Sequence, residues 1–205
     1  MRLYQHPISS NARRVLLTVA HLGIEVEEVL INLMSEEDRR RLAEINPNSK
    51  IPVLEDDGLM LWESAAIMQY LADKAGGHSL YPTELKARAD VNRWMFWGAQ
   101  HFSAAISVYC WENLWKKMVT GVDADPAELA RGAADMEQFA TVLDNHLAGR
   151  EWVSGNALTL ADYALAAPLM YLEKGRLPLT QYANIMAWFQ RVQALPAWKQ
   201  TEAEW

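Results

Sequence analysis

One proline, Pro52, constrains the fold of this chain more than any other residue. It cannot donate a backbone hydrogen bond and directly precedes the apolar run 53–54, so it marks the start of a strand and not its middle. The bond before it, Ile51-Pro52, is of the one kind in which a cis peptide costs only about 0.5–1 kcal/mol. A cis bond would turn the N–H and C=O of Ile51 outward at a sheet edge, where an extended peptide can pair with them. We therefore expect a binding ledge at Ile51.

A polar pair, Glu63-Ser64, follows this strand after one hairpin. The tripeptide 56–58, Asp-Asp-Gly, predicts the hairpin turn between the apolar runs 53–55 and 59–62. Ser64 then opens a helical pattern, and a helix N-terminus with a hydroxyl beside it binds carboxylates. Glu63 can receive an amine. The pair therefore fits the head group of an α-amino acid.

The first part of the chain alternates strand and helix signals. The pattern predicts strands at 2–4 and 26–33, and helices at 12–22 and 35–44, before the hairpin. With the helix from Ser64, this order gives a thioredoxin-like βαβ-ββα domain over residues 1–75. The Gly- and Pro-containing segment 76–83 is predicted to be a linker.

Helical patterns predominate from residue 84 onward, so residues 84–205 are expected to form an all-helical bundle domain. The predicted fold class is thus α/β plus all-α. Long helices are expected at 84–119 and 127–147, separated by a break at 121–126. Thr159 and Asp162 form a capping box with Tyr163 at the staple position, a pattern typical of a structural helix start.

Composition narrows the partners and the compartment. The formal net charge of −7 argues against a nucleic-acid or anionic-membrane partner, since either would need a basic surface, and favours small ligands. The single cysteine, Cys110, excludes an internal disulfide and favours the cytoplasm; we expect it to be an inert buried thiol. No apolar stretch approaches the ~20 residues of a membrane span. The five histidines lack metal-ligand spacing, so no metal is expected.

Three segments together resemble one family across essentially the whole chain. The chain is similar to cytosolic glutathione S-transferases in "HPISSNARRVLLTVAHLG", "NPNSKIPVLEDD…LWESAAIMQYL" and "LTLADYALAAPL". Its serine-bearing first loop most resembles the serine-type phi and theta classes. The resemblance implies a cytoplasmic detoxification enzyme that adds the thiolate of glutathione, its co-substrate, to a hydrophobic electrophile. It also implies a homodimer.

The resemblance singles out two serines before the first helix. In serine-type transferases a hydroxyl donates a hydrogen bond to the glutathione sulfur and favours the thiolate, which is the effective nucleophile. The pattern "HPIS…RRV" resembles the phi-class "HPAS…RRV" and points to Ser9 as this catalytic residue, with Ser10 as the alternative. We expect one serine to activate the thiol, helped by Arg13 and the helix N-terminus, and the other to cap the helix.

The remaining candidate residues bind substrates. Lys50, Ile51, Pro52, Glu63 and Ser64 are the candidates for glutathione, with Lys50 directed at the glycine carboxylate. On the aromatic stripe of the second domain, candidate walls of an apolar co-substrate pocket are Phe102, Ile106 and Tyr109.

Two other functions remain open from the sequence. The same site would serve a glutathione-dependent isomerase of the maleylacetoacetate type, a dehalogenase or a peroxidase. The segment "SSNARR" partly resembles the zeta isomerase signature "SSCSWRVR" but lacks its cysteine. A non-catalytic glutathione-binding or regulatory protein would keep the same fold, because fold does not settle function.

Overall fold

The chain divides into two compact units, each described here by itself. The computed structural model describes residues 1–76 and 80–203, so part of the predicted linker 76–83 lies outside the described residues. Unit 1 comprises Met1–Pro82 together with Ala194–Trp205, and unit 2 comprises Thr83–Gln193. The C-terminal segment is thus grouped with the first unit, whereas the sequence prediction assigned it to the helical domain.

Unit 1 is built on a mixed four-stranded sheet with the order β2-β1-β3-β4. The strands are β1 (Arg2–Gln5), β2 (Glu27–Leu30), β3 (Val53–Asp56) and β4 (Leu59–Trp62). β1 is parallel to β2 and antiparallel to β3, which is antiparallel to β4. The two-residue turn between β3 and β4, Asp57-Gly58, has φ values of 47° and 87°. Positive φ at both residues is what such a tight hairpin requires.

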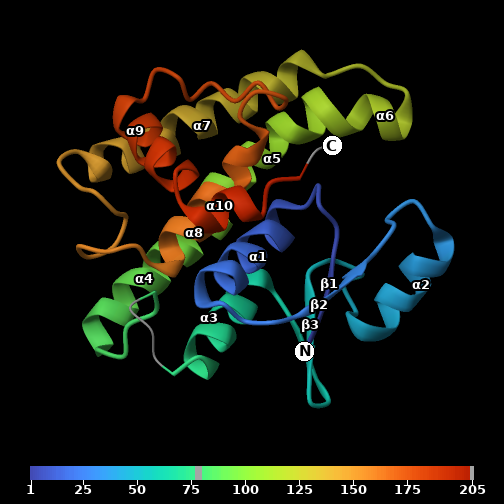
Figure 1. Ribbon diagram of the computed structural model, residues 1–205. Coiled ribbons are helices and arrows are strands. Elements are labelled where there is room, and N and C mark those ends of the chain that lie inside the picture. The colour runs from blue at the N-terminus through green and yellow to red at the C-terminus, as the bar shows by residue number, and fades with distance from the viewer. Residues whose placement is uncertain (77–79, 204–205) are drawn as a thin grey trace. The chain divides into compact units, whose positions relative to one another are not determined.

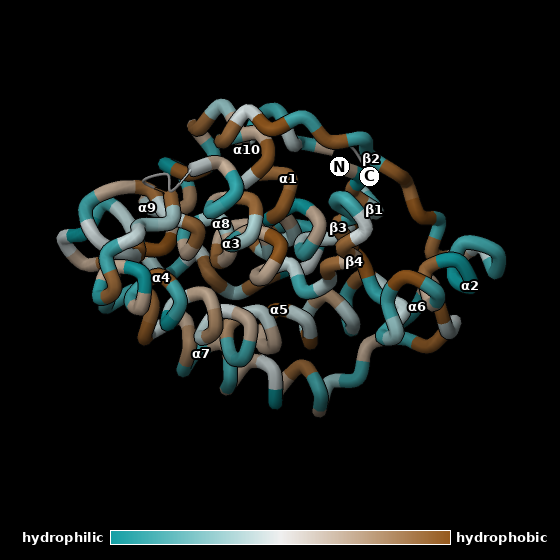
Figure 2. Tube along the Cα trace, turned by 90° about the horizontal axis from the view of Figure 1, so that it is seen from below, coloured by the Kyte–Doolittle hydropathy of each residue, from teal (hydrophilic) through white to brown (hydrophobic). Residues whose placement is uncertain are grey.

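Helices cover both faces of this sheet. The helices of unit 1 are α1 (Ser10–Leu22), α2 (Glu36–Ile45), α3 (Ser64–Lys74) and α10 (Pro196–Gln200). α1 and α3 lie side by side on one face, and α2 lies on the other (Figure 1). Under α2, a buried apolar cluster joins Tyr4, Ile31, Leu42 and Val53. Figure 2 shows α2 as mostly hydrophilic, and Leu42 is its one buried residue. The thioredoxin-like prediction is confirmed.

Unit 2 is helical, as predicted. Its elements are α4 (Leu85–Trp97), η1 (Gly98–Phe102), α5 (Ser103–Cys110), η2 (Trp111–Trp115), α6 (Lys116–Thr120), α7 (Pro126–Leu147), α8 (Leu160–Ala166), η3 (Ala167–Tyr171) and α9 (Ala183–Gln193). η1 and η2 are π-helical and interrupt what the sequence predicted as one helix over 84–119. Among the described residues, no helix combines the length and apolar character needed to cross a membrane.

A buried carboxylate, Asp162, organises the start of α8. It accepts hydrogen bonds from the Val153 N–H (2.9 Å), the Thr159 N–H (2.8 Å) and the Trp188 indole N–H (2.9 Å). The predicted capping box between Thr159 and Asp162 is confirmed. Burial, which disfavours the charged form, raises the Asp162 pKa to about 6, although the donated hydrogen bonds act in the opposite direction.

Candidate functional site

Strand register brings three predicted site segments to one end of the sheet in unit 1. Tyr4 of β1 pairs with Val53 of β3, and Val53 pairs with Trp62 of β4. The loop that follows β1, the residues before β3 and the start of α3 therefore share one end. These segments contain Ser9, Ser10, Lys50, Ile51, Pro52, Glu63 and Ser64. The arrangement brings together every predicted site residue of unit 1.

The loop before β3 carries the expected cis bond, since the Ile51-Pro52 peptide is cis. A buried side chain, Asn46, shapes this loop. Its Nδ2 donates to the Lys50 carbonyl oxygen (2.6 Å), and its Oδ1 accepts from the Asn48 N–H (3.0 Å). Lys50 itself is exposed. The sequence showed Asn46 only as part of a breaker cluster, and the neighbouring Pro47 and Asn48 were its one signal.

The start of α3 is polar and strained. Glu63, at the N-cap position, has a φ of 70° and a ψ of 109° and makes no side-chain capping bond. A non-glycine residue in such a region costs about 1–3 kcal/mol, and residues of this kind cluster at ligand clamps and active sites. Ser64, the first helical residue, is buried. The Glu63 side chain thus accepts no hydrogen bond from the first backbone N–H groups of α3.

The start of α1 corrects one expectation about the serines. Ser9 is the N-cap, and its Oγ accepts a hydrogen bond from the Ala12 N–H at 3.2 Å. Ser10 is the first helical residue, so the expectation that Ser10 caps the helix while Ser9 activates the thiol is wrong in its first half. The two roles do not exclude each other at Ser9. A hydroxyl has two acceptor lone pairs and one O–H donor, and the cap uses a lone pair.

Arg13 also differs from expectation, because it is engaged by the C-terminal segment. Its guanidinium carbon lies 3.9 Å from the centroid of the Trp198 ring, and Nη2 donates to the Trp198 carbonyl oxygen at 3.4 Å. Arg13 is buried, so this cation–π contact is one of the stronger kind. We therefore assign Arg13 to holding α10 against α1, and not to the thiol as predicted.

The site end of the sheet and the hairpin end differ in their electrostatics. α1 and α3 both begin at the site end, and helix N-termini favour negative charge. At the hairpin end, Asp56 accepts from Tyr70 (2.6 Å) and pairs with Lys74. Lys74, and then Tyr70, holds the pKa of Asp56 below its usual range. At the hairpin end Asp56 is thus paired within the protein, whereas the site end presents two helix N-termini.

The candidate pocket walls in unit 2 are buried. Phe102, Ile106 and Tyr109 expose 0, 2 and 8% of their surface, and Phe102 stacks on Trp97 with ring centroids 5.9 Å apart. Such burial is typical of core residues, and their role in a co-substrate pocket stays a prediction. Cys110 is buried as predicted, and burial raises the pKa of its thiol to about 12. Within the described residues, no cluster of His, Cys, Asp or Glu is arranged to hold a metal ion.

Comparison with known families decides what this arrangement is. Residues 1–73 match the glutathione S-transferase N-terminal domain, and residues 102–196 match the glutathione S-transferase C-terminal domain. The chain belongs to the cytosolic glutathione S-transferase family. The transferase fold accounts for both units: the thioredoxin-like unit and the helical one.

Solved glutathione transferases share this fold over almost the whole chain. A delta-class enzyme from Nilaparvata lugens is 30% identical, with a TM-score of 0.83 over 98% of this chain and 92% of that one. A transferase from Rhodospirillum rubrum F11 is 26% identical, with a TM-score of 0.87 over 100% and 92%. Transferase F7 from Populus trichocarpa is 25% identical, with a TM-score of 0.89 over 98% and 96%. Phi- and delta-class transferases, which are serine-type, are among the structural neighbours.

Proposed function

We propose that this protein is an active glutathione S-transferase that adds the thiolate of glutathione to a hydrophobic electrophile. One observation carries the proposal, namely the convergence at one sheet end of a cis-proline ledge and the N-termini of α1 and α3. Glutathione is an extended tripeptide with two carboxylates and a thiol. Its groups match an outward-facing backbone edge flanked by two positively polarised helix ends.

The tripeptide has a defined orientation in this proposal. The backbone of Ile51, next to Pro52, pairs with the cysteinyl residue as an added strand. At the start of α3, Ser64 and the helix N-terminus hold the γ-glutamyl carboxylate, while Glu63 receives the amine. Lys50, exposed beside Ile51, receives the glycine carboxylate. The strained backbone of Glu63 supports this assignment, because strain of this kind is common at ligand clamps.

In this proposal Ser9 activates the thiol of glutathione. A free thiol has a pKa near ~8.5, and only its thiolate attacks electrophiles efficiently. The Ser9 O–H donates to the sulfur while a lone pair of the same oxygen keeps its cap bond with the Ala12 N–H. That cap bond orients and polarises the hydroxyl. The α1 N-terminus adds a favourable field for the negative sulfur.

The proposal includes a homodimer in the cytoplasm. The edge strand β4 exposes three large apolar side chains, with 42% of Leu59, 39% of Met60 and 37% of Trp62 accessible. Apolar groups gathered on an edge strand favour an interface over a free surface. Met60→Lys should shift a dimer toward monomer in multi-angle light scattering, and an unchanged mass would argue against β4 as the contact.

Retention and turnover together test the activity. We expect the protein to bind immobilised glutathione and to conjugate glutathione to 1-chloro-2,4-dinitrobenzene. Retention without turnover of any electrophile would favour a non-catalytic binding protein. Isomerisation of maleylacetoacetate in the absence of conjugation would favour the isomerase alternative.

Thiolate absorbance of enzyme-bound glutathione against pH tests Ser9 directly. Ser9→Ala should raise the apparent pKa of the bound thiol by about one to two units while glutathione affinity changes little. The same variant should lose about 1 kcal/mol of stability, because it removes the α1 cap. Ser10→Ala is the matched control and should leave the titration curve unchanged. A shift in Ser10→Ala without one in Ser9→Ala would transfer the catalytic role to Ser10.

A further inference from the structure

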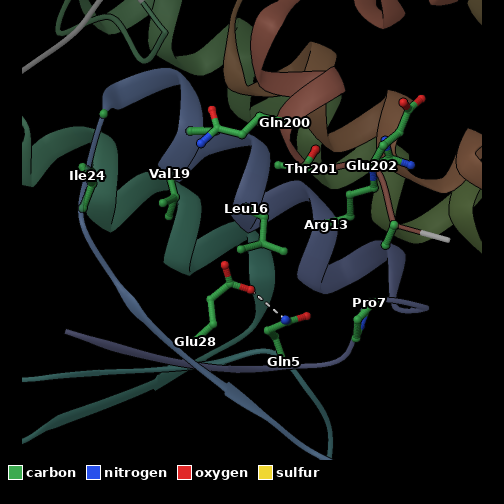
Figure 3. Close-up of a pocket in the computed structure, with 13 residues that line it drawn as sticks. Gln5, Pro7, Arg13, Leu16, Val19, Ile24, Glu28, Gln200, Thr201 and Glu202 are labelled. Carbon is green, nitrogen blue, oxygen red and sulfur yellow. Dashed lines mark hydrogen bonds between the residues drawn. The ribbon is translucent and has the colours of Figure 1, made fainter.

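A cavity of about 450 Å³ lies in unit 1, apart from the proposed glutathione site. It is formed by α1, the chain that enters β2, the end of β1 and the C-terminal segment (Figure 3). Its apolar wall includes Leu16, Val19 and Ile24, and its polar groups include Gln5, Glu28 and Glu202. No residue that we assign to glutathione lines it within the described part of the chain. Its volume lies in the range of small-molecule sites.

One buried amide in this cavity lacks a partner. Gln5 is 2% exposed, and its Nε2 donates to Glu28 Oε2 at 2.8 Å. That bond fixes the orientation of the amide, because an ionised carboxylate accepts hydrogen bonds and cannot donate them. Oε1 must therefore be the other atom, and it has no hydrogen-bond partner among residues 1–76 and 80–203. A buried acceptor without a donor is rare in folded proteins and requires an explanation.

The surroundings of this acceptor are acidic. Gln5 and Glu28 extend from neighbouring strands toward Leu16 of α1 in Figure 3. Glu202 lies on the C-terminal side of the same cavity, and an adjoining hollow shares Glu28 and adds Glu25 and Glu27, of which Glu27 is paired with Arg2 at 3.1 Å. The cationic group of the cavity, Arg13, is stacked on Trp198. The cavity thus combines a buried, unmatched acceptor with the negative charge of Glu28 and Glu202.

We propose that this cavity binds an amine with an apolar ring body, in its protonated form. An ammonium group has three donors and one positive charge, so it can satisfy Gln5 Oε1 and Glu28 together. The ring body would pack against Leu16, Val19 and Ile24, which supply a wall but no hydrogen bonds. A neutral alcohol of the same shape would match the apolar wall but not the charge.

Paired probes test the requirement for charge. Tryptamine and tryptophol carry the same indole and the same two-carbon arm, and they differ in bearing an ammonium or a hydroxyl. Isothermal titration calorimetry on the full chain without glutathione should show tryptamine binding about tenfold more tightly, the effect of one hydrogen bond to a charged group. Equal affinities, or no binding of tryptamine, would overturn the proposal.

A matched pair of variants locates the effect. Glu28→Gln keeps an acceptor for the Gln5 amide, removes the charge and puts an NH2 donor in place of one carboxylate oxygen, and it should reduce the preference for tryptamine to about threefold or less. Glu44→Gln is the control, because it makes the same change in net charge at an exposed α2 position outside the cavity. Equal losses in both variants would mean non-specific attraction to an acidic protein, and would also overturn the proposal.

The Gln5 side-chain amide supplies a readout that does not depend on affinity. Its ¹⁵N–¹H signals should shift on saturation with tryptamine and remain in place with tryptophol at the same concentration. Shifts confined to signals of other residues would place the ligand elsewhere. Because these tests use neither glutathione nor turnover, their outcome is separate from that of the proposed transferase activity.

Discussion

Two helix starts in this molecule use their polar groups in opposite ways. At α8, Asp162 and Thr159 close a capping box, and the carboxylate also accepts from Val153 and Trp188. At α3, the N-cap Glu63 makes no side-chain capping bond and has a strained backbone. Both starts combine an acidic residue with a hydroxyl, so residue types alone do not separate them. The difference is that the groups of α8 are matched within the protein, whereas Glu63 makes no such cap, and we propose that the polar groups of α3 bind glutathione.

Replacing Asp162 should have the largest effect, because this residue pairs the polar groups at the start of α8 within the protein. In Asp162→Ala four buried donors lose their acceptor, namely the Val153 and Thr159 N–H groups, the Thr159 hydroxyl and the Trp188 indole N–H, and each unpaired donor costs about 1–3 kcal/mol. We expect the free energy of unfolding in urea to fall by about 3 kcal/mol or more. If this variant is not recovered folded, Trp188→Phe, which removes one donor, should cost about 1 kcal/mol or more. Losses below these values in both would contradict the comparison.

Removing the Ser64 hydroxyl at the start of α3 should weaken glutathione binding and leave the stability of the protein unchanged. Ser64→Ala is expected to lower glutathione affinity by about 1–3 kcal/mol in calorimetry, since it removes a hydrogen bond to a charged group. Ser35→Ala is the matched control, because Ser35 caps α2 through the Asp38 N–H. It should cost about 1 kcal/mol of stability and leave glutathione affinity unchanged. The opposite pattern would make Ser64 a structural residue.

Relieving the strain at Glu63 should separate stability from binding. Glycine adopts positive φ without a Cβ penalty, so Glu63→Gly should raise the free energy of unfolding by about 1 kcal/mol while glutathione binds less tightly. Arg176, which has a φ of 52° in unit 2, provides the control. Arg176→Gly should alter stability alone. A loss of stability in Glu63→Gly would show that the Glu63 side chain supports the fold.

The pH dependence of stability tests the same buried carboxylate in another way. Burial raises the pKa of Asp162 from 3.8 to about 6, so the folded state holds this proton more tightly than the unfolded state. The resulting stabilisation is present below pH ~4 and is lost as the pH rises through about 6. Other carboxylates such as Asp56 have lowered pKa values and act in the opposite direction. The difference between wild type and Asp162→Asn isolates the contribution, and a pH-independent difference would contradict it.

Residues that favour one local backbone geometry made much of unit 1 and the start of α8 predictable from the sequence. The Asp57-Gly58 turn, the helix end at Gly23 and the cis bond before Pro52 all depend on residues that favour one backbone geometry. The capping box at Thr159 has a fixed spacing of three residues. The signal for each of these features lies within a few neighbouring residues of the sequence.

Features that depend on distant residues were not predictable. The π-helical turns at 98–102 and 111–115 have no local marker, although a Cβ at Gly98 would lie 2.5 Å from Leu165 Cδ2 across the packing with α8. The cap at Ser9 was assigned to its neighbour because spacing alone allows either serine. Neither the unmatched oxygen of Gln5 nor the contact of Arg13 with Trp198 has a signal in the sequence, since each depends on residues far apart in the chain.

The union of the two chain ends in unit 1 has a consequence for biosynthesis. A ribosome releases residues 1–82 long before residues 194–205, yet both segments form one compact unit. Until Trp198 emerges, the stacking of Arg13 on its ring cannot form, and the surface of α1 that packs against α10 stays uncovered. Unit 1 is therefore completed only after unit 2 has been made, and nascent chains stalled before residue 194 would expose this part of α1 to chaperones.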